Sequence, residues 1–217
     1  MSATALADET TLGNLSLRNE PVQARSAARL AGLLDAAAAV IDELGYERLT
    51  TAMVAERAGA SIGTVYRYFP DRIAVLQALG ARNLDRVLSK VSEEIANPAH
   101  TSWTEALDAS FGLLEESFRS EPGFRSLRVG DVIDLRPAPN DRTYNSIVAD
   151  TILEALVQRF DITVDDDARF YIEAAVELFD ALSARAFSRD AQGDARFLAA
   201  GRELATSTLA KHIVSPS

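Results

Sequence analysis

One predicted helix, at residues 62–68, carries side chains whose chemistry suits nucleic-acid recognition. Arg67 has the charge to bind a guanine edge or a phosphate, and Thr64 can hydrogen-bond to either. Tyr66 and Tyr68 can direct their hydroxyls at phosphates. The residues expected to contact DNA are Thr50, Ser61, Ile62, Gly63, Thr64, Tyr66, Arg67, Tyr68 and Arg72.

The elements that must position this helix form a helix-turn-helix pattern. Thr50 and Ser61 stand where a hydroxyl can cap the start of a short helix, over residues 51–58 and 62–68 respectively. Gly59 supplies a residue that tolerates a positive φ in the turn between the two helices. Because both caps and the turn residue fit one register, the pattern predicts a DNA-binding head.

Packing residues at the required spacing support the same pattern. Ala55 is small enough for the second helix to cross the first closely, and Val65 is spaced to face the core. Phe69 is expected to pack in that core. Arg72, at the start of the following helix, would meet a phosphate together with the free N–H groups there. The remaining inner positions are assigned to Val54, Ala58 and Ile62.

The charge of the chain is unevenly distributed. The formal net charge is −10, which is unusual for a protein that neutralises phosphates. However, residues 44–72 contain four arginines against three acids, whereas residues 160–180 contain seven acids and one arginine. The acidic residues therefore lie mostly outside the predicted head.

Helical periodicity continues through the rest of the chain and predicts an all-α protein of about nine helices. Residues 1–20 are polar and aperiodic and are expected to be a disordered arm. Residues 21–70 form the predicted DNA-binding domain, and residues 71–217 form a helical bundle for ligand binding and dimerisation. Residues 134–141 are the best candidate for a loop. The nine helices are expected at residues 21–44, 51–58, 62–68, 71–96, 103–119, 124–132, 142–160, 166–189 and 194–213.

Aromatic side chains on the helices of the bundle are candidates for an apolar effector pocket. Aromatic residues at helical spacing are more often plain core, so both interpretations stay open. Neither His100 nor His212 has a partner at metal-ligand spacing, so no metal site and no cofactor are expected. The candidate effector-binding residues are Trp103, Phe111, Phe118, Tyr144, Phe170 and Tyr171.

The last two predicted helices carry more apolar surface than one core face requires. Such an excess suits an isologous contact between two copies of the chain, and symmetric reading of DNA half-sites requires a dimer. The Asp165–Asp167 run is interpreted as a helix N-terminus, where carboxylates are favourable, with a metal role as the alternative.

The segment from Gly45 to Leu76, with Val54-Ala-Glu-Arg-Ala-Gly-Ala-Ser-Ile-Gly-Thr-Val-Tyr-Arg-Tyr-Phe-Pro-Asp-Arg72 at its centre, closely resembles the DNA-binding head of TetR-type (tetracycline-repressor-like) transcriptional regulators. The resemblance implies a homodimer through the last two helices and repression relieved by a small-molecule effector. It places Ile62 where a basic or polar residue is frequent. It also implies that Thr50, Thr64, Tyr68 and Arg72 contact phosphates and that Gly63 and Tyr66 lie near bases.

Two other classes of function are alternatives: an enzyme built on a helical bundle, and a module whose head binds protein. The sequence lacks a nucleophile elbow, a phosphate loop and the Glu-x-x-His pair of di-iron bundles. It contains no cysteine, no apolar run long enough to span a bilayer and no secretory signal. We therefore expect a cytoplasmic repressor that binds a palindromic double-stranded operator and is not an enzyme.

Overall fold

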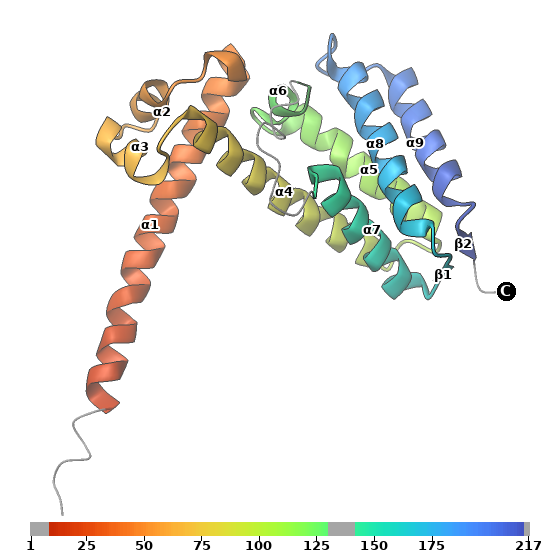
Figure 1. The fold of residues 1–217 in the computed structure, drawn as a ribbon, viewed down its shortest axis with the longest axis horizontal. Helices are drawn as coiled ribbons and strands as arrows, with labels where there is room; N and C mark the ends of the chain where they lie inside the picture. The colour runs from red at the N-terminus through yellow and green to blue at the C-terminus, as the bar shows by residue number, and fades with distance from the viewer. Residues whose placement is uncertain (1–8, 130–141, 215–217) are drawn as a thin grey trace, which may run out of the picture.

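The computed structural model describes residues 9–129 and 142–214, and this part of the chain is almost entirely α-helical (Figure 1). The all-α prediction is confirmed. A single 3-10 turn, η1 (Tyr46–Arg48), precedes α2, and the short strands β1 (Thr163–Val164) and β2 (Ile213–Val214) pair antiparallel. The helices are α1 (Glu9–Leu44), α2 (Thr51–Arg57), α3 (Ile62–Tyr68), α4 (Arg72–Ala96), α5 (Trp103–Ser120), α6 (Phe124–Val129), α7 (Tyr144–Phe160), α8 (Ala168–Phe187) and α9 (Ala195–Leu209).

The helix-turn-helix forms as predicted, because its local signals are satisfied. The Thr50 hydroxyl accepts a hydrogen bond from the Met53 N–H at 3.2 Å, and the Ser61 hydroxyl accepts one from the Thr64 N–H at 3.1 Å. Gly59 adopts φ +58° in the turn. These contacts fix where both short helices begin.

Within the described residues, two ends of helices differ by more than two residues from the predicted positions. Helix α1 begins at Glu9, so residues 9–20 are helical and not a disordered arm, while residues 1–8 lie outside the described residues. Pro21 therefore lies inside the helix and does not mark its start, although proline has no backbone N–H to donate there. Helix α9 ends at Leu209, because Ile213 pairs with Val164 in the two-stranded sheet. The predicted residues 130–132 of α6 and the loop at 134–141 also lie outside the described residues.

Two hydrophobic cores share helices α4 and α6. Leu79 of α4 lies in the core of the head, which is formed with α1, α2 and α3, whereas Val87 lies in the core of the body. In α6, Phe124 belongs to the body core and Leu127 to the head core. The head core therefore continues beyond the boundary expected at residue 70.

A close contact at the start of α6 holds the body against the head. Gly123 adopts φ +74°, and a Cβ there would lie 3.1 Å from the carbonyl oxygen of Ala38 in α1. Its N–H donates to Asp42 Oδ1 at 3.3 Å. Figure 1 shows the result: α4 runs from the head into the body, and α8 and α9 lie side by side on the far side of the body.

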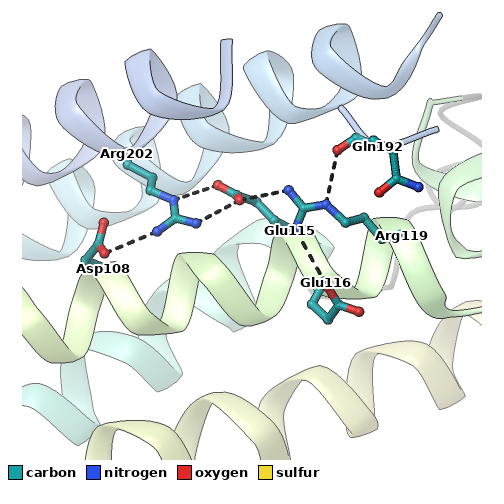
Figure 2. Close-up of polar contacts among 6 residues, drawn as sticks. All are labelled: Asp108, Glu115, Glu116, Arg119, Gln192 and Arg202. Atoms are coloured by element: carbon teal, nitrogen blue, oxygen red, sulfur yellow. Dashed lines mark hydrogen bonds and ion pairs between the residues drawn. The ribbon is translucent and has the colours of Figure 1, made fainter. Parts of the chain in front are cut away.

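A network of charged side chains joins α5 to α9 (Figure 2). The Glu115 carboxylate is almost completely buried and accepts two hydrogen bonds from Arg202, at 2.6 and 2.7 Å. Arg202 also pairs with Asp108 at 3.1 Å, and Arg119 approaches Glu115 at 3.4 Å. The hydrogen bond to Glu115 raises the pKa of Arg202, which keeps the guanidinium charged.

The Arg202→Met variant is expected to lower the free energy of unfolding by about 2–3 kcal/mol, because it leaves the buried Glu115 carboxylate without its main partner. Denaturant unfolding at fixed protein concentration measures this. The double variant Glu115→Met/Arg202→Met should recover most of the loss. Arg196→Met, which removes an exposed pair with Asp194, is the matched control and should change little. An equal loss in both single variants would contradict the structural role of the network.

Candidate nucleic-acid interface

Helix α3 turns one face to the core and the other to solvent. Val65 is fully buried and Phe69, just after the helix, is nearly so, as the spacing predicted. Ile62 is 43% exposed, so its prediction as an inner packing residue is wrong. As the first residue of a seven-residue helix, it lies at the edge of the packed face, where solvent reaches it. The exposed side of the helix includes Ser61, Ile62, Gly63, Tyr66 and Arg67.

A groove of about 920 Å³ lies between α1 and α3. Three of the predicted DNA-contacting residues line it together: Thr64, Arg67 and Tyr68. The Tyr68 hydroxyl lies 3.1 Å from Ser26 Oγ, which ties the end of α3 to α1. The other residues that line the groove are Arg25, Ser26, Ala28, Arg29, Gly32, Leu33 and Ala58.

The groove is positively charged. Arg25, Arg29 and Arg67 have no ion-pair or hydrogen-bond partner among the side chains that the structure describes. Arg57, in contrast, is held by Glu43 at 2.8 and 2.5 Å, and this contact lowers the pKa of the Glu43 carboxyl. The unpaired positive charges of this part of the head therefore point into the groove beside α3.

Six of the nine predicted contact residues lie outside the groove lining: Thr50, Ser61, Ile62, Gly63, Tyr66 and Arg72. Thr50 is exposed at the start of α2, where its hydroxyl already caps the helix. Arg72 is half-buried at the start of α4 and donates a hydrogen bond to the Glu47 carbonyl at 2.7 Å. This bond holds the Arg72 guanidinium against the turn that precedes α2.

Arg25 and Arg29 were not among the residues predicted from the sequence. Their i, i+4 spacing within a predicted helix was visible and places both on one face. Only the fold, which places α1 and α3 on either side of the groove, shows that this face adjoins α3. The candidate interface therefore includes two helices and not the helix-turn-helix alone.

The structure does not bring the six predicted effector residues together. Phe111 stacks on Phe179 in the body core with ring centroids 4.3 Å apart, and Phe118 stacks on Phe187 at 4.9 Å. The remaining four residues occupy different surroundings. Trp103 is half-buried against the core, Tyr144 is buried beneath Arg128, Phe170 is 67% exposed, and Tyr171 stacks on His212 at 3.7 Å.

Across residues 9–129 and 142–214, none of the helices combines the length and the apolar character needed to cross a membrane. The same residues contain no group of three potential metal ligands.

Two family models match this chain. The description "Tetracyclin repressor-like, C-terminal domain" matches residues 101–213, which is just over half of the chain, and "Bacterial regulatory proteins, tetR family" matches residues 33–79. The chain belongs to the TetR family. Both the helix-turn-helix head and the helical body are therefore those of a TetR-type transcriptional regulator.

Individual TetR relatives agree with this assignment. A TetR-family transcriptional regulator from Streptomyces coelicolor is 34% identical, with a TM-score of 0.70 over 86% of this chain and 98% of that one. The transcriptional repressor KstR of Mycolicibacterium smegmatis is 33% identical over 90 residues, which cover 42% of this chain and 40% of KstR. The chain thus spans less than half the length of that curated relative. FadR of Bacillus subtilis, solved with stearoyl-CoA, shares the fold at 19% identity and a TM-score of 0.59, over 82% of this chain and 97% of that one.

The double variant Arg25→Ala/Arg29→Ala is expected to weaken binding to specific and non-specific DNA by the same factor. The factor is the same because phosphate contacts carry no sequence information. Each phosphate contact that is removed should also reduce the slope of log affinity against log salt concentration by about 0.9. Fluorescence anisotropy over a salt series measures both effects. Arg189→Ala removes one positive charge from an exposed position just after α8 and should leave the slope unchanged. An unchanged slope in the double variant would exclude α1 from the interface.

Proposed function

We propose that this TetR-family protein is a transcriptional repressor that binds a palindromic DNA operator as a homodimer and is released by a small-molecule effector. The observation that carries the proposal is the exposed face of α3 beside a groove with three unpaired arginines, in a chain of net charge −10. Unpaired positive charges that lie close together repel one another. Such an arrangement favours binding of a polyanion, which neutralises them.

In this proposal α3 enters the major groove of DNA. Gly63, Thr64, Tyr66 and Arg67 face the bases, and the exposed Ile62 side chain suits contact with a thymine methyl group. Phosphates on either side are bound by Thr50, Tyr68 and Arg72, together with Arg25 and Arg29. Ser61 remains mainly a helix cap, since its hydroxyl is 2.9 Å from that of Thr64 and also accepts the Thr64 N–H.

The proposed dimer forms through α8 and α9. Three large apolar side chains on these helices are unusually exposed: Phe170 at 67%, Leu178 at 42% and Leu204 at 47%. Phe197 on α9 is half-buried and lies under Arg185 of α8, with 5.0 Å between the guanidinium carbon and the ring centroid. Covering such a face with a second copy removes apolar surface from water and sets two heads at a fixed separation.

The proposed effector binds within the body and shifts the population of dimers toward one whose heads no longer fit successive major grooves. Helices α4 and α6 are the connection, since each contributes residues to both cores. FadR was solved with stearoyl-CoA, so the same fold accommodates a ligand with a long apolar part. We propose an effector of predominantly apolar character here too. The protein would act in the cytoplasm and would not catalyse a reaction.

The wild-type protein is expected to form a salt-sensitive, sequence-specific complex with a palindromic site in its own upstream region, about a thousandfold tighter than with unrelated DNA. Gel shift or anisotropy at fixed salt measures this ratio. Arg67→Ala should reduce the ratio about tenfold or more by removing one base contact. The absence of any such complex would overturn the proposal and favour the alternative of a protein-binding head.

The double variant Leu178→Asp/Leu204→Asp is expected to be monomeric, because it places charges on the exposed apolar face of α8 and α9. Size-exclusion chromatography with light scattering measures the mass. Operator affinity should fall at least about a hundredfold, since one head must then bind alone. Ala199→Asp places the same charge on α9 in the groove shared with α5 and should leave the dimer intact. A double variant that remains dimeric would rule out this interface.

A further inference from the structure

A second groove, of about 460 Å³, lies where the head meets the body, and we call it the junction groove. Gly45, Tyr46 and Glu47 line it from η1 and the residue before it, and α6 and the end of α8 supply the other side. Its volume is within the range of about 300–1,000 Å³ that is usual for small-molecule sites. The lining residues from α6 and α8 are Arg125, Ser126, Phe187 and Ser188.

The junction groove combines open space with two aromatic residues. A Cβ built on Gly45 would meet no atom within 4 Å. Tyr46 is half-buried against the core of the head, whereas Phe187 belongs to the core of the body and stacks on Phe118 at 4.9 Å. Because each aromatic side chain is packed on its own core, the groove has a firm apolar lining on two sides.

Two opposite charges line the junction groove without pairing. Arg125 is half-buried and has no ion-pair or hydrogen-bond partner among the described residues. The Glu47 carboxylate has no ion-pair partner in the same part of the chain, and it accepts a hydrogen bond of 3.5 Å from the Tyr46 hydroxyl. The neighbouring Arg119 and Arg128, in contrast, are each held by a carboxylate. One positive and one negative group are therefore open to a ligand.

A ligand with a single charge would fit this pair of groups poorly. A carboxylate that approaches Arg125 in the junction groove also approaches Glu47, and an amine that approaches Glu47 also approaches Arg125. A molecule that carries both an ammonium and a carboxylate group can form a charge-assisted hydrogen bond at each end. Its apolar part can then contact the aromatic lining. The chemistry of the groove thus favours a zwitterion with an apolar side chain.

The junction groove also adjoins the helix-turn-helix. Glu47 lies three residues before Thr50, the residue that caps α2, and its carbonyl accepts a hydrogen bond from Arg72 at 2.7 Å. Arg125 lies on α6, which contributes residues to both cores. A molecule bound to both side chains would therefore connect the turn before α2 directly to α6.

We propose that the junction groove binds a free amino acid with a large apolar side chain, whose carboxylate is bound by Arg125 and whose ammonium group is bound by Glu47. This amino acid is a second ligand, in addition to the apolar effector of the proposed function. The inference does not rest on that function.

Isothermal titration calorimetry of the full chain with L-phenylalanine, L-tryptophan and L-leucine is expected to show binding of at least one of them. The analogues that lack one charged group are then compared with the amino acid that binds best. For phenylalanine these are 3-phenylpropionate, without the ammonium group, and 2-phenylethylamine, without the carboxylate. Each analogue should bind about tenfold more weakly, the loss of one charge-assisted hydrogen bond.

Two variants separate the ends of the ligand. Arg125→Met should bind the amino acid about tenfold more weakly and no better than the analogue without the carboxylate. Glu47→Gln should bind it no better than the analogue without the ammonium group. Neither variant should lower the melting temperature of the free protein, because neither side chain has an ion pair to lose. Arg48→Met is the matched control, since Arg48 is exposed beside Glu47 but does not line the groove, and it should bind as the wild type does.

Three outcomes would overturn the inference: none of the three amino acids binds, both analogues bind as tightly as the amino acid, or either variant keeps the preferences of the wild type. Operator binding, measured separately by anisotropy, tests something else. Its absence would contradict the proposed function and leave the result for the amino acid standing.

Discussion

The close approach of α6 to α1 is the contact that holds the body against the head. Gly123 fits against the Ala38 carbonyl only because it has no side chain and adopts a positive φ. That fit allows Leu127 to enter the head core, while the next residue, Arg128, pairs with Asp180 of α8 in the body. Two adjacent residues of α6 thus contact different parts of the molecule. A shift of α6 in the body would therefore also disturb the head core, because packed cores repack between discrete arrangements and do not deform continuously.

The pairing of charges explains how an acidic chain presents a basic surface. In the body, several arginines are held by carboxylates, as in the pairs Arg128–Asp180 and Arg202–Glu115. On the head, Arg57 is paired with Glu43, whereas Arg25 and Arg29 have no such partner among the described side chains. The electrostatic potential at the surface of the head is determined by the unpaired charges nearby, since charges more than about 10 Å away are largely screened at physiological salt. The net charge of the whole molecule is therefore a poor guide to its partner.

The parts of the fold that could be predicted from sequence are those fixed by local chemistry. The caps at Thr50 and Ser61 and the turn at Gly59 involve residues within one helical turn of each other, and all three are as predicted. Features that depend on distant partners were missed. The pairing of Ile213 with Val164 ends α9 early, and the groove between α1 and α3 adds two arginines to the candidate interface. Spacing alone also could not separate the core ring of Phe111 from the solvent-exposed ring of Phe170, since both lie on predicted amphipathic helices.

The orientation of α9 in the body is fixed by a buried ion pair. Its inner side carries Arg202, whose bidentate contact with Glu115 sets the rotation of α9 about its own axis. With that rotation set, Leu204 faces outward, 47% exposed, and extends the exposed apolar face of α8. A buried ion pair adds little net stability compared with apolar packing, so its value here is that it specifies one orientation. If two copies meet through this face, the body stays rigid, and the separation of the heads then depends on α4 and α6, which contribute residues to both cores.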